Sequence, residues 1–471
     1  MTSPDFYDVA IVGAGLAGLT AGARLAERGV RAVVLEKGAG EDYPCNVRIA
    51  GGVFHICFRH INDDEAALLE AIKRNTQGYA QDNQAALVAR NTRAAVQWFK
   101  EKGARFSSGG ATEGFREMTL AAPPTDTTRP WQGHGGGELL RILTGVLEKG
   151  GGKLLRGASA KRLRMEGKRC VGLDVEREGG SLTVAARNVL LADGGFQASP
   201  ALVREYIVPH PEKLRQRNSG SGGGDALKMA REVGARLVGM DKFYGHVLAR
   251  EAMLSDMLWP YPMVDPICAA GVVVDGSGRR FADEGLGGVW MTNRIAHLPD
   301  ALSAVTVFDE KIWNGPAASG HIYGANPGLV RAGANLVQAQ DLTALARAVG
   351  LPAEALEATI AEYNSAVESG QTGRLNPTRT AATYKPFPIA NPPYYALRLC
   401  AGLTFTMGGI AVDEVGRVLN ERSEAIPGLY AAGCCTGGLD GGPHAGYVGG
   451  LAKSAAMGLV TADHLADAVR H

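Results

Sequence analysis

The stretch Tyr7-Asp8-Val9-Ala10-Ile11-Val12-Gly13-Ala14-Gly15-Leu16-Ala17-Gly18 decides the fold class of this protein. Its apolar beginning predicts a buried strand over 7–12, and the residues that follow predict a helix over 16–28 with small side chains on one face. A second apolar strand is expected over 31–35, directly before Glu36. Strand, glycine turn, helix, strand and acidic residue, in this order, are the fingerprint of a βαβ unit that binds a dinucleotide.

Each glycine of the turn has a physical reason in such a unit. Gly13 permits the tight turn, Gly15 lets the backbone approach a pyrophosphate at the helix N-terminus, and Gly18 allows the helix to pack closely. Glu36 is expected to bind ribose hydroxyls. A glycine turn that holds no ligand is the alternative, and the complete fingerprint argues against it. These residues alone leave FAD and NAD both open.

Glycine clusters later in the chain favour FAD. The small residues of Asn46–Gly52 suit a segment that runs beside a flavin ring. Gly433 and the glycine pairs between 437 and 450 precede a helix expected over 450–468. The N-terminal amides of that helix suit the N1–C2=O edge of a flavin, where negative charge gathers on reduction. A free nicotinamide cofactor needs no such second cradle, so we expect FAD.

The composition excludes several other classes of protein. The 471 residues are 45% apolar and 21% charged with a formal net charge of +1, so no nucleic-acid partner is expected. The seven cysteines show neither a CxxC pair nor zinc-like spacing, which indicates no metal, no disulfide framework and a reducing cytoplasm. No uncharged apolar run approaches about 18 residues, so neither membrane insertion nor export is expected.

The distribution of glycine along the chain predicts an interrupted domain. We expect an α/β fold in which a Rossmann-like FAD-binding domain, a mixed sheet with helices, is interrupted by an α+β cap domain. Residues 1–244 form its first part, 245–386 the cap or substrate domain, and 387–471 its second part. Within the middle segment the glycine clusters thin out, and a polar pattern over 341–369 predicts two helices joined by a turn.

Further elements are expected within the first part. Helical periodicity covers 63–102, and a helix is expected over 135–148 after a glycine run. Apolar alternation then predicts the strands of a small antiparallel layer that returns to the main sheet, over 153–163, 170–176, 181–185 and 188–191.

In these motifs the chain resembles the flavoprotein family of fumarate reductase, succinate dehydrogenase and 3-ketosteroid dehydrogenase. The resemblance lies in Asp8–Glu36, Gly133–Leu143, Ala192–Phe196, Gly222–Ala230, Gly278–Glu284 and Gly402–Gly458. Within the family it is most similar to tricarballylate dehydrogenase, through 278–285, 402–406 and Gly446-Tyr447. The resemblance implies a cap that closes over the flavin, with substrate between them. It also implies removal of hydrogen across a C–C bond α,β to a carbonyl or carboxylate, or the reverse ene-reductase reaction with an external electron donor.

Departures from the family narrow the expected substrate. Thr404-Phe405 stand where fumarate reductases carry a substrate-binding histidine, and Tyr447 stands where they carry an arginine. Neither the cap Thr-Glu pair near 265–270 nor the arginine of an Asn-Glu-x-x-x-Arg proton donor after Asp283-Glu284 is evident. A succinate-like clamp is therefore not expected. Aromatic residues in place of cationic anchors indicate a less charged or ring-shaped substrate, or a carboxylate held by other residues.

Within the resemblance, the expected FAD-binding residues are Gly13, Gly15, Leu16, Ala17, Gly18, Glu36, Lys37, Arg48, Ala50, Gly51, Gly52, Ala192, Asp193, Gly194, Gly433, Gly449, Gly450 and Leu451. The histidine that attaches FAD covalently in succinate dehydrogenases falls on Cys45, so we expect non-covalent FAD. The expected partners are a small carbonyl or carboxylate substrate and an unidentified electron acceptor, a redox protein or oxygen. The chain itself carries no haem motif or iron–sulfur cysteine pattern.

Four residues are candidates for the chemistry. Tyr447 is expected to hydrogen-bond a substrate carbonyl or to act as a base, and His246 and His444 are candidate substrate contacts. Arg294 is the cap-side cation best placed to hold a carboxylate. For each residue the alternative is a packed or surface side chain without a catalytic role. Cys434-Cys435 are expected to be spectator thiols, since adjacent cysteines bridge only with strain.

Overall fold

The computed structural model describes residues 6–107, 118–121, 135–259, 264–319 and 324–470. Its contacts divide the chain into two compact units. Unit 1 comprises residues 1–207, 218–243 and 405–471, and unit 2 comprises residues 208–217 and 244–404. The sequence predicts a return to the first domain at residue 387. Unit 2 extends further, because one long strand, β13 (Tyr394–Thr406), belongs to its sheet for nearly its whole length.

The main sheet of unit 1 is built around the predicted βαβ unit. Strand β1 (Phe6–Val12) pairs in parallel with β2 (Ala32–Glu36) on one side and with β6 (Gly180–Leu191) on the other. The parallel run continues through β3 (Lys153–Arg156) beyond β2 and β16 (Ala425–Ala431) beyond β6. The carboxyl ends of these strands therefore meet at one edge, where open α/β sheets bind their ligands.

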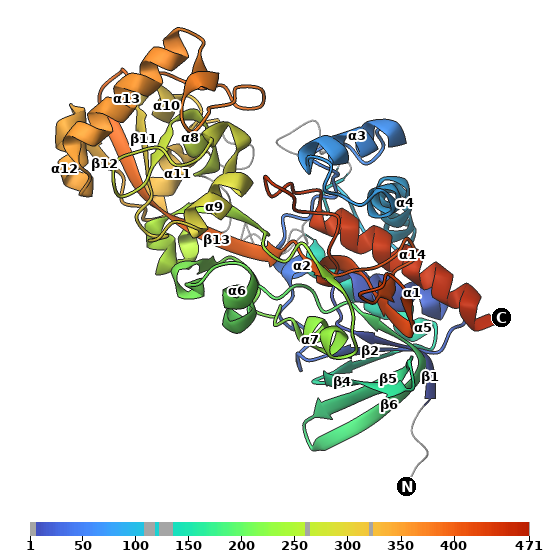
Figure 1. Ribbon diagram of the computed structural model, residues 1–471. Helices are drawn as coiled ribbons and strands as arrows, with labels where there is room; N and C mark the ends of the chain where they lie inside the picture. Colours follow the sequence, from blue (N-terminus) through green and yellow to red (C-terminus); the bar gives the residue numbers. More distant parts are fainter. Residues whose placement is uncertain (1–5, 108–117, 122–134, 260–263, 320–323, 471) are drawn as a thin grey trace. The chain divides into compact units, whose positions relative to one another are not determined.

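An antiparallel layer extends the same sheet, as expected. Strand β4 (Ser159–Glu166) pairs with β5 (Arg169–Arg177), and β5 pairs with β6; Figure 1 shows the three strands as a meander. Two boundaries differ from the sequence prediction. The segment expected over 153–163 is broken between β3 and β4 at Gly157, whose φ is +64°. The segments expected over 181–185 and 188–191 form one continuous strand, because the residues between them also pair within β6.

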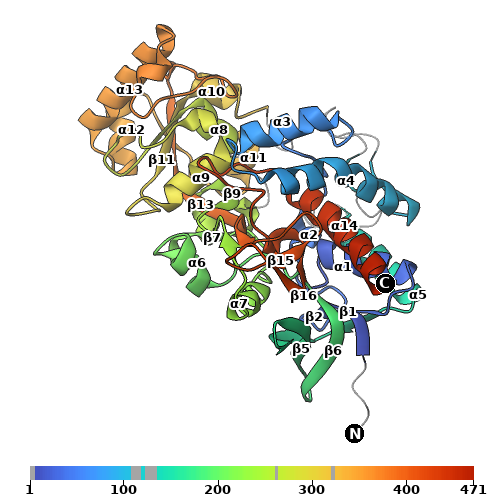
Figure 2. The same ribbon diagram turned by 45° about the vertical axis from the view of Figure 1, so that its right-hand side comes forward.

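Helices cover the sheet of unit 1. Helix α1 (Leu16–Glu27) packs against α14 (Gly450–Arg470) and α5 (Gly136–Lys149), and α14 also packs against α4 (Asp82–Glu101); Figure 2 shows α1 and α14 side by side. A Cβ on Gly458 would lie 2.6 Å from the Ala17 oxygen, so the small residues let these two helices approach. The remaining elements are α2 (Asn46–Ile49), α3 (Glu65–Asn75), α6 (Pro200–Tyr206), α7 (Asp225–Glu232), β8 (Leu237–Val238), β14 (Gly409–Ile410) and β15 (Arg417–Leu419).

Unit 2 is organised around β13. This strand pairs antiparallel with β11 (Val305–Asp309) and β12 (Val337–Ala339), and in parallel with β7 (Arg215–Gln216). It also pairs with β9 (Phe243–Ala249), and β10 (Val272–Val274) joins β11. The predicted pair of helices within 341–369 is confirmed. The helices are α8 (Asp265–Ala270), α9 (Gly288–Ala296), α10 (Glu310–Asn314), α11 (Ala325–Arg331), α12 (Leu342–Val349) and α13 (Ala353–Glu368).

Candidate functional site

The glycine turn after β1 has the geometry that its sequence predicts. Gly13 has a φ of +97°, and a Cβ there would lie 2.6 Å from the Asp193 Cα. A Cβ on Gly18 would lie 1.9 Å from the Gly13 oxygen, so both positions exclude any side chain. Gly15 is different, because the nearest atoms to its Cβ position are 3.9 Å away. The open space before the α1 N-terminus is suited to a pyrophosphate rather than to protein atoms.

Glu36 holds the glycine turn in place. Its side chain is buried, with Oε2 accepting a hydrogen bond from the Ala14 amide at 3.0 Å and Oε1 accepting one from the Gly38 amide at 2.8 Å. The Tyr43 hydroxyl donates to the Ala14 oxygen at 2.7 Å. A carboxylate has about four acceptor positions, so Glu36 keeps capacity for ribose hydroxyls beyond these two bonds.

Asp193 has a buried carboxyl oxygen that a bound ligand would satisfy. It follows β6 at the sheet edge beside Gly13, and its Oδ2 accepts a hydrogen bond from the Ala226 amide at 2.9 Å. Its Oδ1 is shielded from solvent and has no hydrogen-bond partner among the described residues. Burial raises the pKa of this carboxyl to about 7. A hydroxyl of FAD would donate to this oxygen, and a protonated Asp193 would donate to a phosphate oxygen, so the cradle fits the cofactor.

The other expected cofactor residues lie around this edge in different environments. Lys37 pairs with Asp225 at 3.1 Å, and Arg48 pairs with Asp42 at 3.0 Å. Both cations therefore already have carboxylate partners. The positions of Gly51 and Gly194 are open, with no atom within 4 Å of the place that a Cβ would take. The remaining expected residues lie at the start of α1 (Leu16, Ala17), after α2 (Ala50, Gly52), after β6 and β16 (Ala192, Gly433) and at the start of α14 (Gly449, Gly450, Leu451).

Helix α14 begins at a glycine pair that carries Tyr447 beside it. The Gly450 amide donates a hydrogen bond to the Tyr447 hydroxyl oxygen at 3.1 Å. The Tyr447 ring packs edge-on against His55, Phe58 and Phe405, with centroids 5.5, 5.9 and 6.0 Å away. Burial lowers the pKa of His55 to about 4, so this histidine is neutral near pH 7. The Tyr447 phenol thus lies at the N-terminus of α14, where the helix dipole is positive. Aromatic side chains surround its ring, and the neutral His55 adds no charge.

A buried ion pair supports the glycine loop before α14. Lys453 and Asp440 are 1% and 0% exposed, with Nζ and Oδ2 3.4 Å apart. Lys453 also donates to the Thr436 oxygen at 2.8 Å, and Asp440 accepts from the Val448 amide at 2.8 Å. The pair fixes both ends of the loop that carries Tyr447. The sequence prediction missed it; its signal is a lysine on the otherwise apolar face of the last helix.

Unit 2 contains a polar cluster around His246. Its Nδ1 lies 2.5 Å from Asp265 Oδ2, and its Nε2 lies 2.9 Å from the Tyr244 hydroxyl. The Val247 amide donates to the other oxygen of Asp265 at 2.9 Å. Burial lowers the pKa of His246 and raises that of Tyr244 to about 12. The charge of Arg217 acts to lower both pKa values, so this cation also faces the cluster.

The two remaining catalytic candidates have other neighbours. His444 has its Nδ1 2.6 Å from Gln77 Nε2, which places its ring beside the turn after α3. Arg294 is exposed on α9, with its guanidinium 5.5 Å from the Trp290 ring centre on the same helix. Arg280, another cation of the expected cap, forms a buried ion pair with Glu284 at 2.6 Å. Trp131, Gln132 and His134, which precede the helix expected over 135–148, lie outside the described residues.

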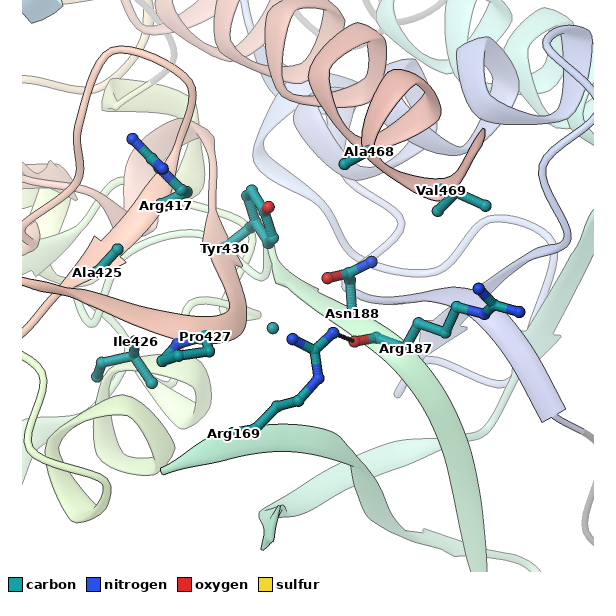
Figure 3. A pocket seen from close by; sticks show the side chains of 11 residues that line it. Arg169, Arg187, Asn188, Arg417, Ala425, Ile426, Pro427, Tyr430, Ala468 and Val469 are labelled. Carbon is teal, nitrogen blue, oxygen red and sulfur yellow. Dashed lines mark hydrogen bonds between the residues drawn. The ribbon is translucent and has the colours of Figure 1, made fainter. Parts of the chain in front are cut away.

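A cavity of about 420 Å³ lies in unit 1 away from this edge (Figure 3). Arg169, Arg187 and Arg417 line it near Asn188. Since Asn188 and Gly428 precede the carboxyl ends of β6 and β16, the cavity is not at the edge where the glycine turn lies. Two of the guanidinium groups are already paired, Arg187 with Asp8 at 3.4 Å and Arg417 with Asp413 at 2.5 Å. The positive charge available to an anion is therefore small.

Metal-binding and membrane-spanning features are absent from the described part of the chain. Within those ranges, no group of three or more His, Cys, Asp and Glu side chains is arranged to hold a metal ion. All seven cysteines are free thiols, Cys434 and Cys435 included. Among the described helices, none is both long and apolar enough to cross a membrane.

Comparison with known proteins identifies the class. The FAD binding domain family matches residues 8–446, so the chain belongs to this family and the expected FAD cofactor is confirmed. The chain is 27% identical to NADH:fumarate oxidoreductase of Klebsiella pneumoniae over 94% of its own length and 46% of that protein. It is 27% identical to 3-oxosteroid 1-dehydrogenase of Mycobacterium tuberculosis over 60% and 53% of the two chains. The expected family resemblance is thereby confirmed. The expected activity, that of an FAD-dependent oxidoreductase, and the resemblance to tricarballylate dehydrogenase stay predictions.

The fold class is confirmed by a solved structure. The 3-ketosteroid-Δ4-(5α)-dehydrogenase of Rhodococcus jostii superposes with a TM-score of 0.74 at 23% identity, over 99% of this chain and 98% of that one. The chain spans about half the length of the fumarate oxidoreductase, or less in the case of a similar acrylate oxidoreductase. Those proteins therefore contain further segments that have no counterpart in this match.

Proposed function

We propose that the protein is a dehydrogenase that desaturates a C–C bond α,β to a carbonyl or carboxylate in a small organic acid or cyclic ketone. When bound, FAD takes up the β hydrogen as hydride at its N5 atom. The protein has to hold the substrate, polarise its carbonyl and remove the α proton. The residues around Tyr447 and His246 are the candidates for these tasks.

The observation that carries this proposal is the position of Tyr447. Its oxygen accepts a hydrogen bond from Gly450, the first residue of α14. An oxygen that accepts one bond becomes a better donor through its own proton, because hydrogen-bond chains polarise one another. Tyr447 is thus suited to donate to a substrate carbonyl and to stabilise the enolate-like charge that forms as the α proton leaves.

The surroundings of Tyr447 favour a substrate with little charge. Phe58 and Phe405 pack against its ring, and Thr404-Phe405 replace the histidine expected in a fumarate site. Binding a dicarboxylate among such side chains would require desolvation of its charge without an ionic partner from these positions. We therefore expect a cyclic ketone or a weakly charged acid, and poor turnover of fumarate and succinate.

The cofactor is proposed to be bound without a covalent link. Gly13, Gly15 and Gly18 would hold the pyrophosphate and Glu36 the ribose. The N-terminus of α14 would stabilise the negative charge that a flavin gains on reduction. At the position where succinate dehydrogenases attach FAD, burial raises the pKa of the Cys45 thiol to about 11. A thiol that stays protonated is a poor nucleophile, which supports dissociable FAD.

The reverse reaction is the second candidate. Two relatives are named NADH:fumarate oxidoreductase and NADH:acrylate oxidoreductase, names that fit reduction of a C=C bond. The same residues would serve, with hydride leaving the flavin and a proton donor supplying the α carbon. An external electron donor would then replace the electron acceptor of the dehydrogenase.

Anaerobic mixing tests both directions. Oxidised holoprotein is mixed with a panel of cyclic ketones, ketosteroids and tricarboxylates, and the loss of flavin absorbance is followed. Chemically reduced holoprotein is then mixed with the corresponding unsaturated compounds, and reoxidation is followed. Bleaching by a saturated ketone or acid supports the dehydrogenase. Reoxidation by unsaturated compounds alone would favour the reductase, and fumarate turnover at about 1–1000 per second would overturn the substrate class.

A further inference from the structure

We propose that Tyr244 is a second catalytic tyrosine, a proton-transfer group for the α carbon that is backed by a His246–Asp265 relay. The proposal rests on the proposed CH–CH chemistry and adds two residues, Tyr244 and Asp265, to those expected from the sequence. It starts from a chain of two short contacts in unit 2, Tyr244 hydroxyl to His246 Nε2 at 2.9 Å and His246 Nδ1 to Asp265 Oδ2 at 2.5 Å.

The hydrogen bonds set the direction of the relay. A carboxylate accepts only, so His246 carries its proton on Nδ1 and donates it to Asp265. Its Nε2 is then an acceptor, and the Tyr244 hydroxyl donates to it. The lowered pKa of His246, caused by burial, agrees with a neutral ring. This is the arrangement in which an acid orients a histidine and the histidine takes a proton from a hydroxyl.

The backbone is adapted to hold Asp265 in this arrangement. A Cβ on Gly288 would lie 1.9 Å from the Asp265 Cγ, so a side chain at 288 would displace the carboxylate. The Val247 amide holds the second oxygen of Asp265, and the Thr292 hydroxyl donates to the His246 oxygen at 3.1 Å. Gly288 also stands four residues after Glu284. The family resemblance leads us to expect the arginine of the Asn-Glu-x-x-x-Arg proton donor at this position. The chain thus has a carboxylate and a histidine where that arginine is missing.

The polarity of Tyr244 suits a base. The residue is half-buried, and its hydroxyl hydrogen is directed to His246. Arg217 faces it and is itself fixed, since Nε donates to the Trp259 oxygen and Nη1 to the Thr404 hydroxyl at 2.7 and 2.9 Å. A fixed positive charge stabilises the phenolate character that develops while the proton moves.

The proposed step removes one proton and one hydride from the substrate. The α C–H bond breaks and its proton passes to the Tyr244 oxygen, while the phenolic proton passes to His246 Nε2. The imidazolium that forms is stabilised by Asp265, which stays ionised. The electron pair of the α C–H bond forms the C=C bond, and the β hydrogen leaves with its pair as hydride to the oxidised cofactor. His246 then returns its extra proton to solvent, and the external acceptor would take up the two electrons.

The first test compares single variants at saturating substrate. Tyr244→Phe removes only the phenolic oxygen, and we expect the anaerobic rate of flavin reduction to fall by about 100-fold or more. Substrate Kd and FAD content should change by less than a few-fold. Tyr395→Phe is the matched control, because it also removes one buried phenolic oxygen in unit 2, the one that bonds Glu310. Reduction by Tyr244→Phe at the control's rate would overturn the proposal.

A double-mutant cycle separates a relay from independent contributions. His246→Gln and Asp265→Asn should each slow flavin reduction by about 10-fold or more in the wild-type background. In the Tyr244→Phe background they should add less than a few-fold, because residues that act as one unit are not additive. If each double variant were slowed by the product of its two single effects, His246 and Asp265 would act independently of Tyr244. Gly288→Ala, which displaces Asp265 through the backbone, should behave as Asp265→Asn does.

A substrate-independent measurement distinguishes failure of the relay from failure of the proposed function. Nitrogen-15 NMR of histidine-labelled holoprotein reports which ring nitrogen of His246 carries the proton. We expect Nδ1–H with Nε2 unprotonated, and a change in the Nε2 signal in Tyr244→Phe. The opposite tautomer would overturn the relay even if substrates bleach the flavin. The expected tautomer, with a panel that bleaches nothing and reoxidises nothing, would leave the geometry intact, overturn the proposed function and with it the catalytic role of Tyr244.

Discussion

Tyr447 in unit 1 and Tyr244 in unit 2 are both half-buried phenols beside a histidine, yet their hydroxyl groups are bonded in opposite senses. The Tyr447 oxygen accepts from the Gly450 amide at a helix N-terminus. The Tyr244 hydroxyl donates to His246, which is backed by Asp265. His55 contacts the Tyr447 ring by its edge, whereas His246 meets the Tyr244 oxygen.

This difference teaches how the environment of a phenol determines what it does. A phenol that accepts a bond at the positive end of a helix is made a better donor, which suits an electrophile for a carbonyl. A phenol that donates to a neutral histidine is prepared to lose its proton, which suits a base. The two tyrosines are therefore suited to two different contributions to one proposed reaction.

Removing both phenolic oxygens gives the largest expected effect. If the two tyrosines have separate roles, Tyr447→Phe/Tyr244→Phe should reduce flavin about 10⁴-fold more slowly than wild type, the product of two effects of about 100-fold. The measurement is the anaerobic rate of flavin reduction at saturating substrate. A double variant no slower than either single one would mean that the two phenols act as a unit, and the distinction between them would be wrong.

Tyr447→Phe alone is expected to slow flavin reduction about 100-fold while folding and FAD binding persist. Only the oxygen that accepts from Gly450 is lost, and the ring contacts with His55, Phe58 and Phe405 remain. A packing role predicts a change within a few-fold. A rate near that of wild type would remove Tyr447 from the mechanism and leave His444 as the other candidate of this loop.

Glu36→Ala tests the cofactor side of unit 1 apart from the chemistry. We expect FAD to bind more weakly by about 1–3 kcal/mol, the usual value of hydrogen bonds to a charged group. The dissociation constant of FAD, measured by fluorescence titration of the apoprotein, checks this. Glu36→Gln keeps one acceptor oxygen and is the matched control. An unchanged FAD affinity in Glu36→Ala would count against the ribose role. When Glu36→Ala is saturated with FAD, its rate of flavin reduction should stay within a few-fold of wild type.

Asp193→Asn gives the smallest expected effect. Among the described residues, Asp193 in unit 1 has no histidine partner, whereas Asp265 in unit 2 is hydrogen-bonded to His246. The folded-state pKa of Asp193 is raised to about 7, so the folded apoprotein binds an additional proton and loses stability as the pH rises from about 4 to 7. Asparagine removes this loss. We expect the free energy of unfolding to increase by about 1–2 kcal/mol at pH 8, because the side chain is only partly buried.

Urea denaturation of the apoprotein at pH 5 and pH 8 measures the effect of Asp193→Asn. The difference between variant and wild type should be about a third as large at pH 5 as at pH 8, because the loss of stability begins near pH 4 and is complete only above pH 7. A difference that is equal at both values would show that the proton is not on this carboxyl.

Much of unit 1 follows from local sequence. The glycine turn, the strands on either side and Glu36 are predictable because their roles depend on backbone geometry within some thirty consecutive residues. The break at Gly157 was not predicted, since a single glycine inside an apolar pattern is compatible with a continuous strand. The place of β13 in the sheet of unit 2 depends on strands that lie far away along the chain, so no local pattern specifies it.

The sequence by itself determined the FAD fold, the glycine turn proposed to hold the cofactor, and Tyr447 as a candidate, because each depends on short segments with a fixed spacing. Only the tertiary structure decided the rest of the proposed chemistry. Tyr244 and His246 are neighbours in sequence, but Asp265 reaches them from α8 through the space that Gly288 leaves open. Such a relay depends on side chains that tertiary folding brings together, so no periodicity or spacing along the chain could have predicted it.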